Sequence, residues 1–146
     1  MELLTDVGLP EEARQIKREA REFAQEYIAP NAAEYFTSGA YPHELVEPAV
    51  EAGFVGKGIS EEYGGRGTSL VEDVAVNEEF FRADAGLSMA LLGRAFGASM
   101  IELFGTDEQK DRYLPPIPSG EEFSGGAISE PETGSDLMGM ETTADR

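Results

Sequence analysis

The sequence predicts a mainly α-helical protein with about five helices followed by one β-strand. Apolar residues recur at steps of three and four along most of residues 10–114, as they do on one face of a helix. Residues that favour helix starts precede these stretches, and glycine or proline follows them. Residues with small or β-compatible side chains follow one another only at Phe123–Ser129, which has a turn on each side.

The first helix is expected from Pro10 to Ala29, because proline suits the first helical position and two glutamates follow it. Pro30 should end or kink this helix. A shorter helix is expected from Pro42 to Gly53, with an exposed His43 near its start. The glycine-rich stretch from Gly53 to Gly67 predicts an irregular loop. It is not a nucleotide P-loop, because no Gly-Lys-Ser/Thr sequence follows.

Two capping boxes mark later helix starts. The one at Ser69–Glu72 begins a helix that should end near Ala83. A helix that is buried on most sides is then expected from Ala85 to Phe104, because it contains only two charged residues. The second capping box, Thr106–Gln109, begins the last helix, which should end before Pro115.

Composition excludes several classes of function. The 146 residues are 40% hydrophobic, so a core is expected, and their formal net charge of −18 repels nucleic acids and anionic membranes. With no cysteine and one histidine, thiolate catalysis, a histidine-based triad and a metal cluster are not expected. No run of about 18 apolar residues occurs, so we expect a cytoplasmic protein without a membrane span. The acid excess suggests adaptation to a salty interior; the alternative is a merely solubilising surface.

The segment Ser129–Asp136 is the best candidate for chemistry. Pro131 restricts its own backbone and that of the residue before it, while Gly134 permits a close backbone approach. Ser129 and Ser135 place hydroxyl groups on either side of the turn. Such a turn can present N–H and hydroxyl groups to a polar ring or a phosphate. From the residues alone, an ordinary surface turn remains the alternative.

This segment resembles the flavin-contacting motif of the acyl-CoA dehydrogenase family, a hydroxyl residue followed by Glu-Pro-x-x-Gly-Ser-Asp. Ser60–Gly67 is similar to the family's Pro-Glu-x-Tyr-Gly-Gly-x-Gly turn. Phe104–Lys110, with Tyr113–Pro115 and Ser119–Glu121 after it, resembles the family's Gly-Thr/Ser-x-Glu-Gln-Lys helix and following turn. These motifs stand in the family's order over nearly the whole chain.

The resemblance implies an N-terminal helical domain over residues 1–120 and the start of a middle β-domain over residues 121–146, cut short by truncation. It also implies FAD as cofactor. The backbone of Ile128 and the backbone and hydroxyl of Ser129 would bond the flavin ring. Ser135 would lie near the pyrophosphate or the thioester end of acyl-CoA. Ala127 and Gly134 complete the implied cofactor-binding residues.

The family reaction is the α,β-dehydrogenation of acyl-CoA. By the same resemblance, Ser88, Leu92 and Phe96 lie at steps of four on one helical face and would floor the acyl pocket. Plain core packing of Leu92 and Phe96 is the alternative. The family's catalytic glutamate lies in a C-terminal domain, so no catalytic residue is expected in this chain. Electron-transfer flavoprotein is the implied partner, and a homotetramer the implied assembly.

The sequence departs from the family pattern in places. Ser60 replaces the usual proline, Ser129 the commoner threonine, and Gly126 stands where the family often has a bulky residue near the flavin. The shared motifs leave two alternatives open: an acyl-CoA oxidase or related flavoenzyme, and a helical interaction module without catalysis.

Overall fold

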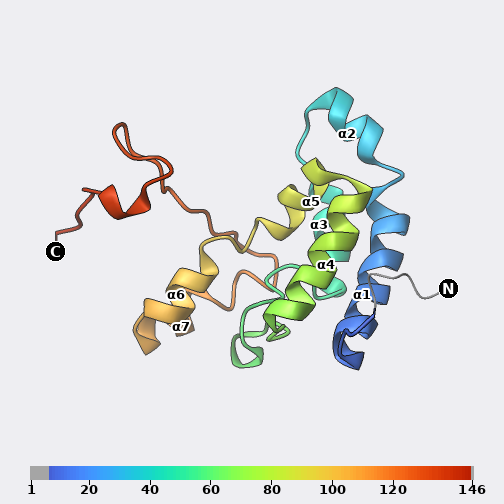
Figure 1. Ribbon diagram of the computed structural model, residues 1–146, viewed down its shortest axis with the longest axis horizontal. Helices are drawn as coiled ribbons and strands as arrows, with labels where there is room; N and C mark the ends of the chain where they lie inside the picture. The colour runs from blue at the N-terminus through green and yellow to red at the C-terminus, as the bar shows by residue number, and fades with distance from the viewer. Residues whose placement is uncertain (1–6, 146) are drawn as a thin grey trace.

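The structure is a computed structural model that describes residues 7–145. Within that range it holds seven α-helices and no extended strand, so the mainly α fold class is confirmed. Helices α1, α3, α4 and α5 pack together as one body, α6 and α7 lie beside it, and the last residues run away from both (Figure 1). The helices are α1 (Glu11–Phe23), α2 (Ala32–Ser38), α3 (His43–Glu51), α4 (Leu70–Ala83), α5 (Ala85–Leu92), α6 (Ala98–Phe104) and α7 (Asp107–Tyr113).

Helix α1 confirms the first predicted helix and its buried stripe. Pro10 precedes it, and the expected apolar residues Ala13, Ile16, Ala20 and Phe23 are buried. The helix continues over Ala24–Ile28 as a π-helical turn, in which each N–H reaches five residues back instead of four. Regular structure then stops before Pro30, as predicted.

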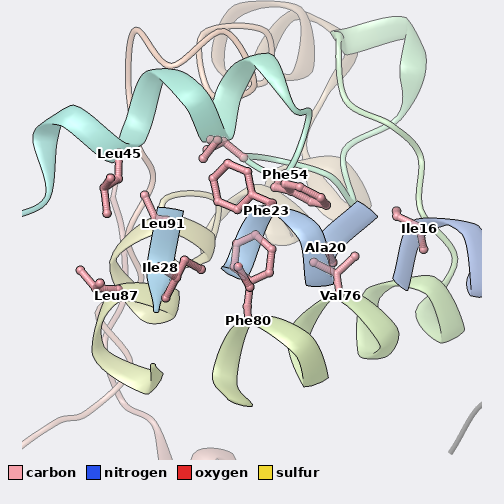
Figure 2. Close-up of a cluster of buried hydrophobic side chains, with 13 residues drawn as sticks. Ile16, Ala20, Phe23, Ile28, Leu45, Phe54, Val76, Phe80, Leu87 and Leu91 are labelled. Carbon is pink, nitrogen blue, oxygen red and sulfur yellow. The ribbon is translucent and has the colours of Figure 1, made fainter. Parts of the chain in front are cut away.

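An aromatic cluster forms the centre of the main core (Figure 2). Phe23 of α1 stacks on Phe80 of α4 with ring centroids 5.3 Å apart. Phe54, from the loop after α3, meets both rings edge-on at 5.3 and 5.0 Å. Such aromatic pairs add about 0.5–1.5 kcal/mol each beyond the apolar area they bury. These three rings therefore join α1, α4 and the glycine-rich loop.

Charged side chains also link α1 to α4. The carboxylate of Glu79 is almost fully buried and accepts two hydrogen bonds from Arg21, at 3.0 and 2.8 Å. Lys17, equally buried, donates to Glu78 at 2.8 Å. Desolvation would raise the pKa of Glu79, but the hydrogen bond and charge of Arg21, together with Arg82 and Lys17, hold it below the ordinary value.

The helix starts were predicted correctly from their caps. Ser69 and Glu72 form a reciprocal capping box before α4, and Thr106 and Gln109 form one before α7. Helix α3 and the irregular glycine-rich loop also match, and His43 is exposed. Helix α2 was not predicted. Its side chains are all at least partly exposed, so it lacks the buried apolar stripe that identifies a helix in a sequence.

The single helix expected over Ala85–Phe104 was wrong. The chain forms α5, then turns through Gly93–Gly97, and only then forms α6. Two glycines in one helical stretch each cost about 1 kcal/mol relative to alanine, which favours this break. The expected burial was wrong too, because several large side chains of this stretch are exposed: Met89, Phe96, Met100, Leu103 and Phe104.

The strand expected over Phe123–Ser129 is not formed. Only one residue of it pairs, in an isolated parallel bridge between Ser124 and Ala95. Residues 141–145 are also irregular. A strand needs neighbouring strands to satisfy its backbone, and none is present among residues 7–145.

Among the helices that the structure describes, none combines the length and the apolar composition needed to cross a bilayer.

Candidate functional site

The site is built around the break between α5 and α6. There the backbone of residues 94–97 lies outside both helices and contacts the first residues of the C-terminal segment, which comprises residues 120–145. The N–H of Ser124 donates to the carbonyl of Arg94 at 2.7 Å, and the N–H of Gly97 donates to the hydroxyl of Ser124 at 3.2 Å. The break therefore ties the helical body to the segment that carries the predicted flavin motif.

Arg94 reinforces this junction with its side chain. Its guanidinium donates to the carbonyl of Gly120 at 3.1 Å and, at a longer 3.4 Å, to that of Glu122. It also donates at 3.1 Å to the hydroxyl of Tyr41, which in turn donates to a carbonyl of α5. The guanidinium carbon lies 5.6 Å from the ring centroid of Phe123, within cation–π range. One side chain thus connects α5, the loop before α3 and the start of the C-terminal segment.

An apolar cavity of about 630 Å³ opens beside this junction. Its volume lies within the range of small-molecule sites, about 300–1,000 Å³. Its walls come from the loop before α3, from α5 and the break, and from the C-terminal segment. The lining residues are Tyr41, His43, Met89, Ala90, Gly93, Arg94, Phe96, Phe123 and Gly125.

A second cavity, of about 410 Å³, shares Met89, Gly93 and Phe96 with the first. It has a polar side, where the ammonium of Lys57 lies 2.6 Å from a carboxylate oxygen of Asp73. Because Asp73 compensates this charge, Lys57 is not an open cation for an anionic ligand. The apolar side of this cavity could take a hydrocarbon chain.

The three predicted acyl-pocket residues do not share one helical face, because α5 ends at Leu92. Ser88 is fully buried, and its hydroxyl donates to the carbonyl of Asp84 at 2.5 Å, inside the helix. Leu92 lines the smaller cavity, and Phe96, in the break, lines both. The structure therefore brings Leu92 and Phe96 to a common cavity and leaves Ser88 in the helix packing.

The predicted flavin-contacting residues lie on the C-terminal segment, away from the helices (Figure 1). Ala127, Ile128, Ser129, Gly134 and Ser135 are all exposed. In the part of the chain that the structure describes, residues 125–129 form no hydrogen bond through their backbone. Their N–H and C=O groups are therefore open to a polar partner.

The turn beyond these residues is held by its own side chains. Glu130 and Thr133 exchange backbone hydrogen bonds at 2.9 and 3.2 Å. The carboxylate of Glu130 accepts the N–H groups of Glu141 and Thr142, each at 2.9 Å, and these bonds lower its pKa. Thr133 is buried and donates to the carbonyl of Gly139 at 3.0 Å. This turn is therefore a closed hydrogen-bonded unit that presents Ser129 and Ser135 outward.

Sequence reasoning missed Arg94, Tyr41 and Phe123. The signal for Arg94 was present, since it is one of two charges in a long apolar stretch. The roles of Tyr41 and Phe123 depend on contacts between distant parts of the chain. Among the described residues, no group of three or more His, Cys, Asp or Glu side chains is placed to hold a metal ion.

Comparison with known proteins gives consistent matches. The family model of the acyl-CoA dehydrogenase N-terminal domain matches residues 10–121. The chain is 38% identical to a (2S)-methylsuccinyl-CoA dehydrogenase of Cereibacter sphaeroides, over 94% of this chain and 25% of the relative. It is 35% identical to a glutaryl-CoA dehydrogenase of Desulfococcus multivorans, over 96% of this chain and 37% of the relative.

The fold matches as well as the sequence. The crystal structure of glutaryl-CoA dehydrogenase from Mycobacterium smegmatis superposes with a TM-score of 0.84 at 32% identity, covering 98% of this chain and 37% of that one. The chain thus spans only a quarter to somewhat over a third of the length of these relatives.

Proposed function

The chain belongs to the acyl-CoA dehydrogenase family through its N-terminal domain, and on that basis we propose that it is part of a flavin-dependent enzyme that introduces a double bond between the α and β carbons of an acyl-CoA. The observation that supports this most is the position of the two cavities. Both lie at the break between α5 and α6, and the larger one is also lined by Phe123 and Gly125 of the segment that leads to the flavin motif.

The donor groups of this chain fit a flavin. A flavin ring is flat and carries polar atoms along its edge, so it needs N–H, C=O and hydroxyl groups beside an apolar wall. The exposed backbone of Ile128 and the hydroxyl of Ser129 offer such groups. At Gly134 no atom lies within 4 Å of where a side chain would begin, so a ligand can approach closely. We assign these residues, with Ala127 and Ser135, to FAD.

The FAD that Ala127, Ile128, Ser129, Gly134 and Ser135 would hold would supply the acceptor for the hydride from the β carbon. A carboxylate from outside this chain removes the α proton. The part of these residues is to bind and position: Leu92 and Phe96 supply apolar walls that exclude water from the acyl chain. Ser135 lies on the turn that would face the pyrophosphate or the thioester, and Ser88 supports the wall from within α5. Fixed donors near the thioester carbonyl would make the α proton more acidic.

The domain division follows the same proposal. Residues 1–120 form the helical domain, and residues 121–146 begin a β-domain whose first strand pairs once further strands are present. The end of the family match at residue 121 supports this boundary. Electron-transfer flavoprotein as electron acceptor, a homotetrameric assembly, a cytoplasmic location and adaptation to salt stay predictions from the sequence.

The test uses the complete protein that contains this chain. We expect a yellow preparation that reduces an artificial electron-accepting dye when given acyl-CoA. The 146-residue chain alone should be colourless and inactive, because two to four hydrogen bonds of about 0.5–1.5 kcal/mol each cannot offset the cost of association. A complete protein without flavin, or one inactive on every acyl-CoA, would contradict the proposal. A yellow and active 146-residue chain would show that the site is complete within these residues.

A further inference from the structure

Two adjacent glycines in the C-terminal segment differ in their surroundings. A side-chain carbon built on Gly126 would lie 2.9 Å from Cε1 and 3.0 Å from Cδ1 of Phe96. At Gly125 no atom lies within 4 Å of the same position. The ring of Phe96 therefore occupies the space into which a side chain at position 126 would extend.

The backbone around this contact is held close. A side-chain carbon on Gly97 would lie 2.7 Å from the carbonyl oxygen of Gly125. The two backbone segments can therefore lie this close only because residue 97 has no side chain. The hydrogen bonds of Ser124 to Arg94 and Gly97 fix the same approach. Ser124 is therefore held two residues before position 126, and an atom added at position 126 would collide with the ring of Phe96.

Phe96 has space to be displaced into. Its ring borders both the 630 Å³ and the 410 Å³ cavity, whereas Gly126 belongs to the lining of neither. Its side chain is 55% exposed, so no close packing on the far side holds it in place. A ring pushed away from residue 126 has room to move into either cavity, where it would reduce the space for an acyl chain.

We propose that Phe96 and Gly126 are a size-matched pair that sets the acyl-chain length accepted by the enzyme. That the ligand is an acyl chain rests on the proposed function, whereas the pairing of the two residues rests on the contact between the Phe96 ring and position 126. The ring at position 96 divides the space into two cavities, and the absence of a side chain at position 126 determines where that ring lies. Neither residue takes part in the chemical step.

The activity test compares three variants in the complete protein, using straight-chain acyl-CoA substrates from short to long. Phe96→Ala joins the two cavities and should raise kcat/KM for long relative to short substrates by roughly tenfold or more, the scale of a few methylenes in an apolar pocket. Gly126→Ala should shift the preference the other way. The double variant should behave like Phe96→Ala, because no ring remains to be displaced. Phe96→Leu keeps an apolar side chain and replaces Phe96→Ala if the latter does not fold.

A second readout does not depend on activity. Gly126→Ala should change the midpoint of thermal unfolding more when Phe96 is present than in the Phe96→Ala background, since contacting residues are non-additive. Gly125→Ala is the control for this measurement, with no clash expected. Equal effects of Gly126→Ala in both backgrounds, or an unchanged chain-length preference in all variants of an active enzyme, would overturn the pairing alone. A wild-type enzyme that is inactive on every acyl-CoA would instead contradict the proposed function. In that case the unfolding measurement would still test the contact between Phe96 and residue 126.

Discussion

Replacing Arg94 with methionine should loosen the C-terminal segment from the helical body. Methionine retains the apolar stem of the side chain and removes the guanidinium. The hydrogen bond to Gly120, made by a charged donor at 3.1 Å, is worth about 1.5–3 kcal/mol. The stacking on Phe123, which is largely exposed, adds about 0.5–1 kcal/mol. Because the site is open to solvent on one side, we take the lower part of this sum, about 2–3 kcal/mol.

The amide of Ser124 reports this loss directly, because its hydrogen bond to the carbonyl of Arg94 must break when the segment detaches. A change of about 2–3 kcal/mol corresponds to hydrogen exchange at this amide that is roughly 30- to 150-fold faster. Amides in the centres of α1 and α4 should be unchanged, since the segment does not contact them closely. Arg112→Met is the matched control, because Arg112 stacks on the neighbouring Tyr113 within an exposed helix. Unchanged exchange at Ser124 would refute the role of Arg94 as the clamp of this junction.

Further predictions concern stability and the acyl cavity. Glu79→Gln removes the buried carboxylate that accepts two hydrogen bonds from Arg21 and should lower the free energy of unfolding by about 1–3 kcal/mol in urea titrations. Glu11→Gln, at an exposed ion pair, should cost about 0–1 kcal/mol. Because the folded pKa of Glu79 lies below its ordinary value of 4.5, its contribution is complete above that pH and is lost as the pH falls through the folded value. The wild type and Glu79→Gln should therefore converge in stability in acid, and a constant difference down to low pH would contradict this. The midpoint of thermal unfolding should rise with KCl up to molar concentration, where the Debye length is about 3 Å, because the net charge is −18; a flat or falling midpoint would argue against salt adaptation. Leu92→Ala in the complete enzyme should shift the preference toward longer acyl groups, while a loss of stability of about 2–5 kcal/mol with unchanged preference would identify a core residue instead.

The helical part of the fold was readable from local sequence. The buried stripe of α1, the capping boxes at Ser69 and Thr106, and the stop before Pro30 depend on residues within one or two turns of each other. The exposed helix α2 escaped notice because it buries no complete apolar stripe. For local signals of this kind, side-chain periodicity and backbone hydrogen bonding are fixed by nearby residues alone.

The site was only partly readable. The flavin motif was identified through its resemblance to the family's motif, and the same resemblance pointed to Leu92 and Phe96 as acyl-pocket residues; both line a cavity. The helical register assumed for them was wrong, because the glycines at 93 and 97 allow the chain to turn. Arg94 could be singled out as a charge in an apolar stretch, but its partners could not.

The sequence by itself therefore determined where α1, α3, α4 and α7 form, and which turn resembles a flavin site. The tertiary structure decided the break between α5 and α6, the pairing of Ser124 with Ala95, and the contact of Phe96 with Gly126. The reason is physical: the last two of these features join residues about 30 positions apart, and whether they form depends on how the helices pack. The strand expected over Phe123–Ser129 shows the same dependence, since a strand forms only where neighbouring strands pair with its backbone.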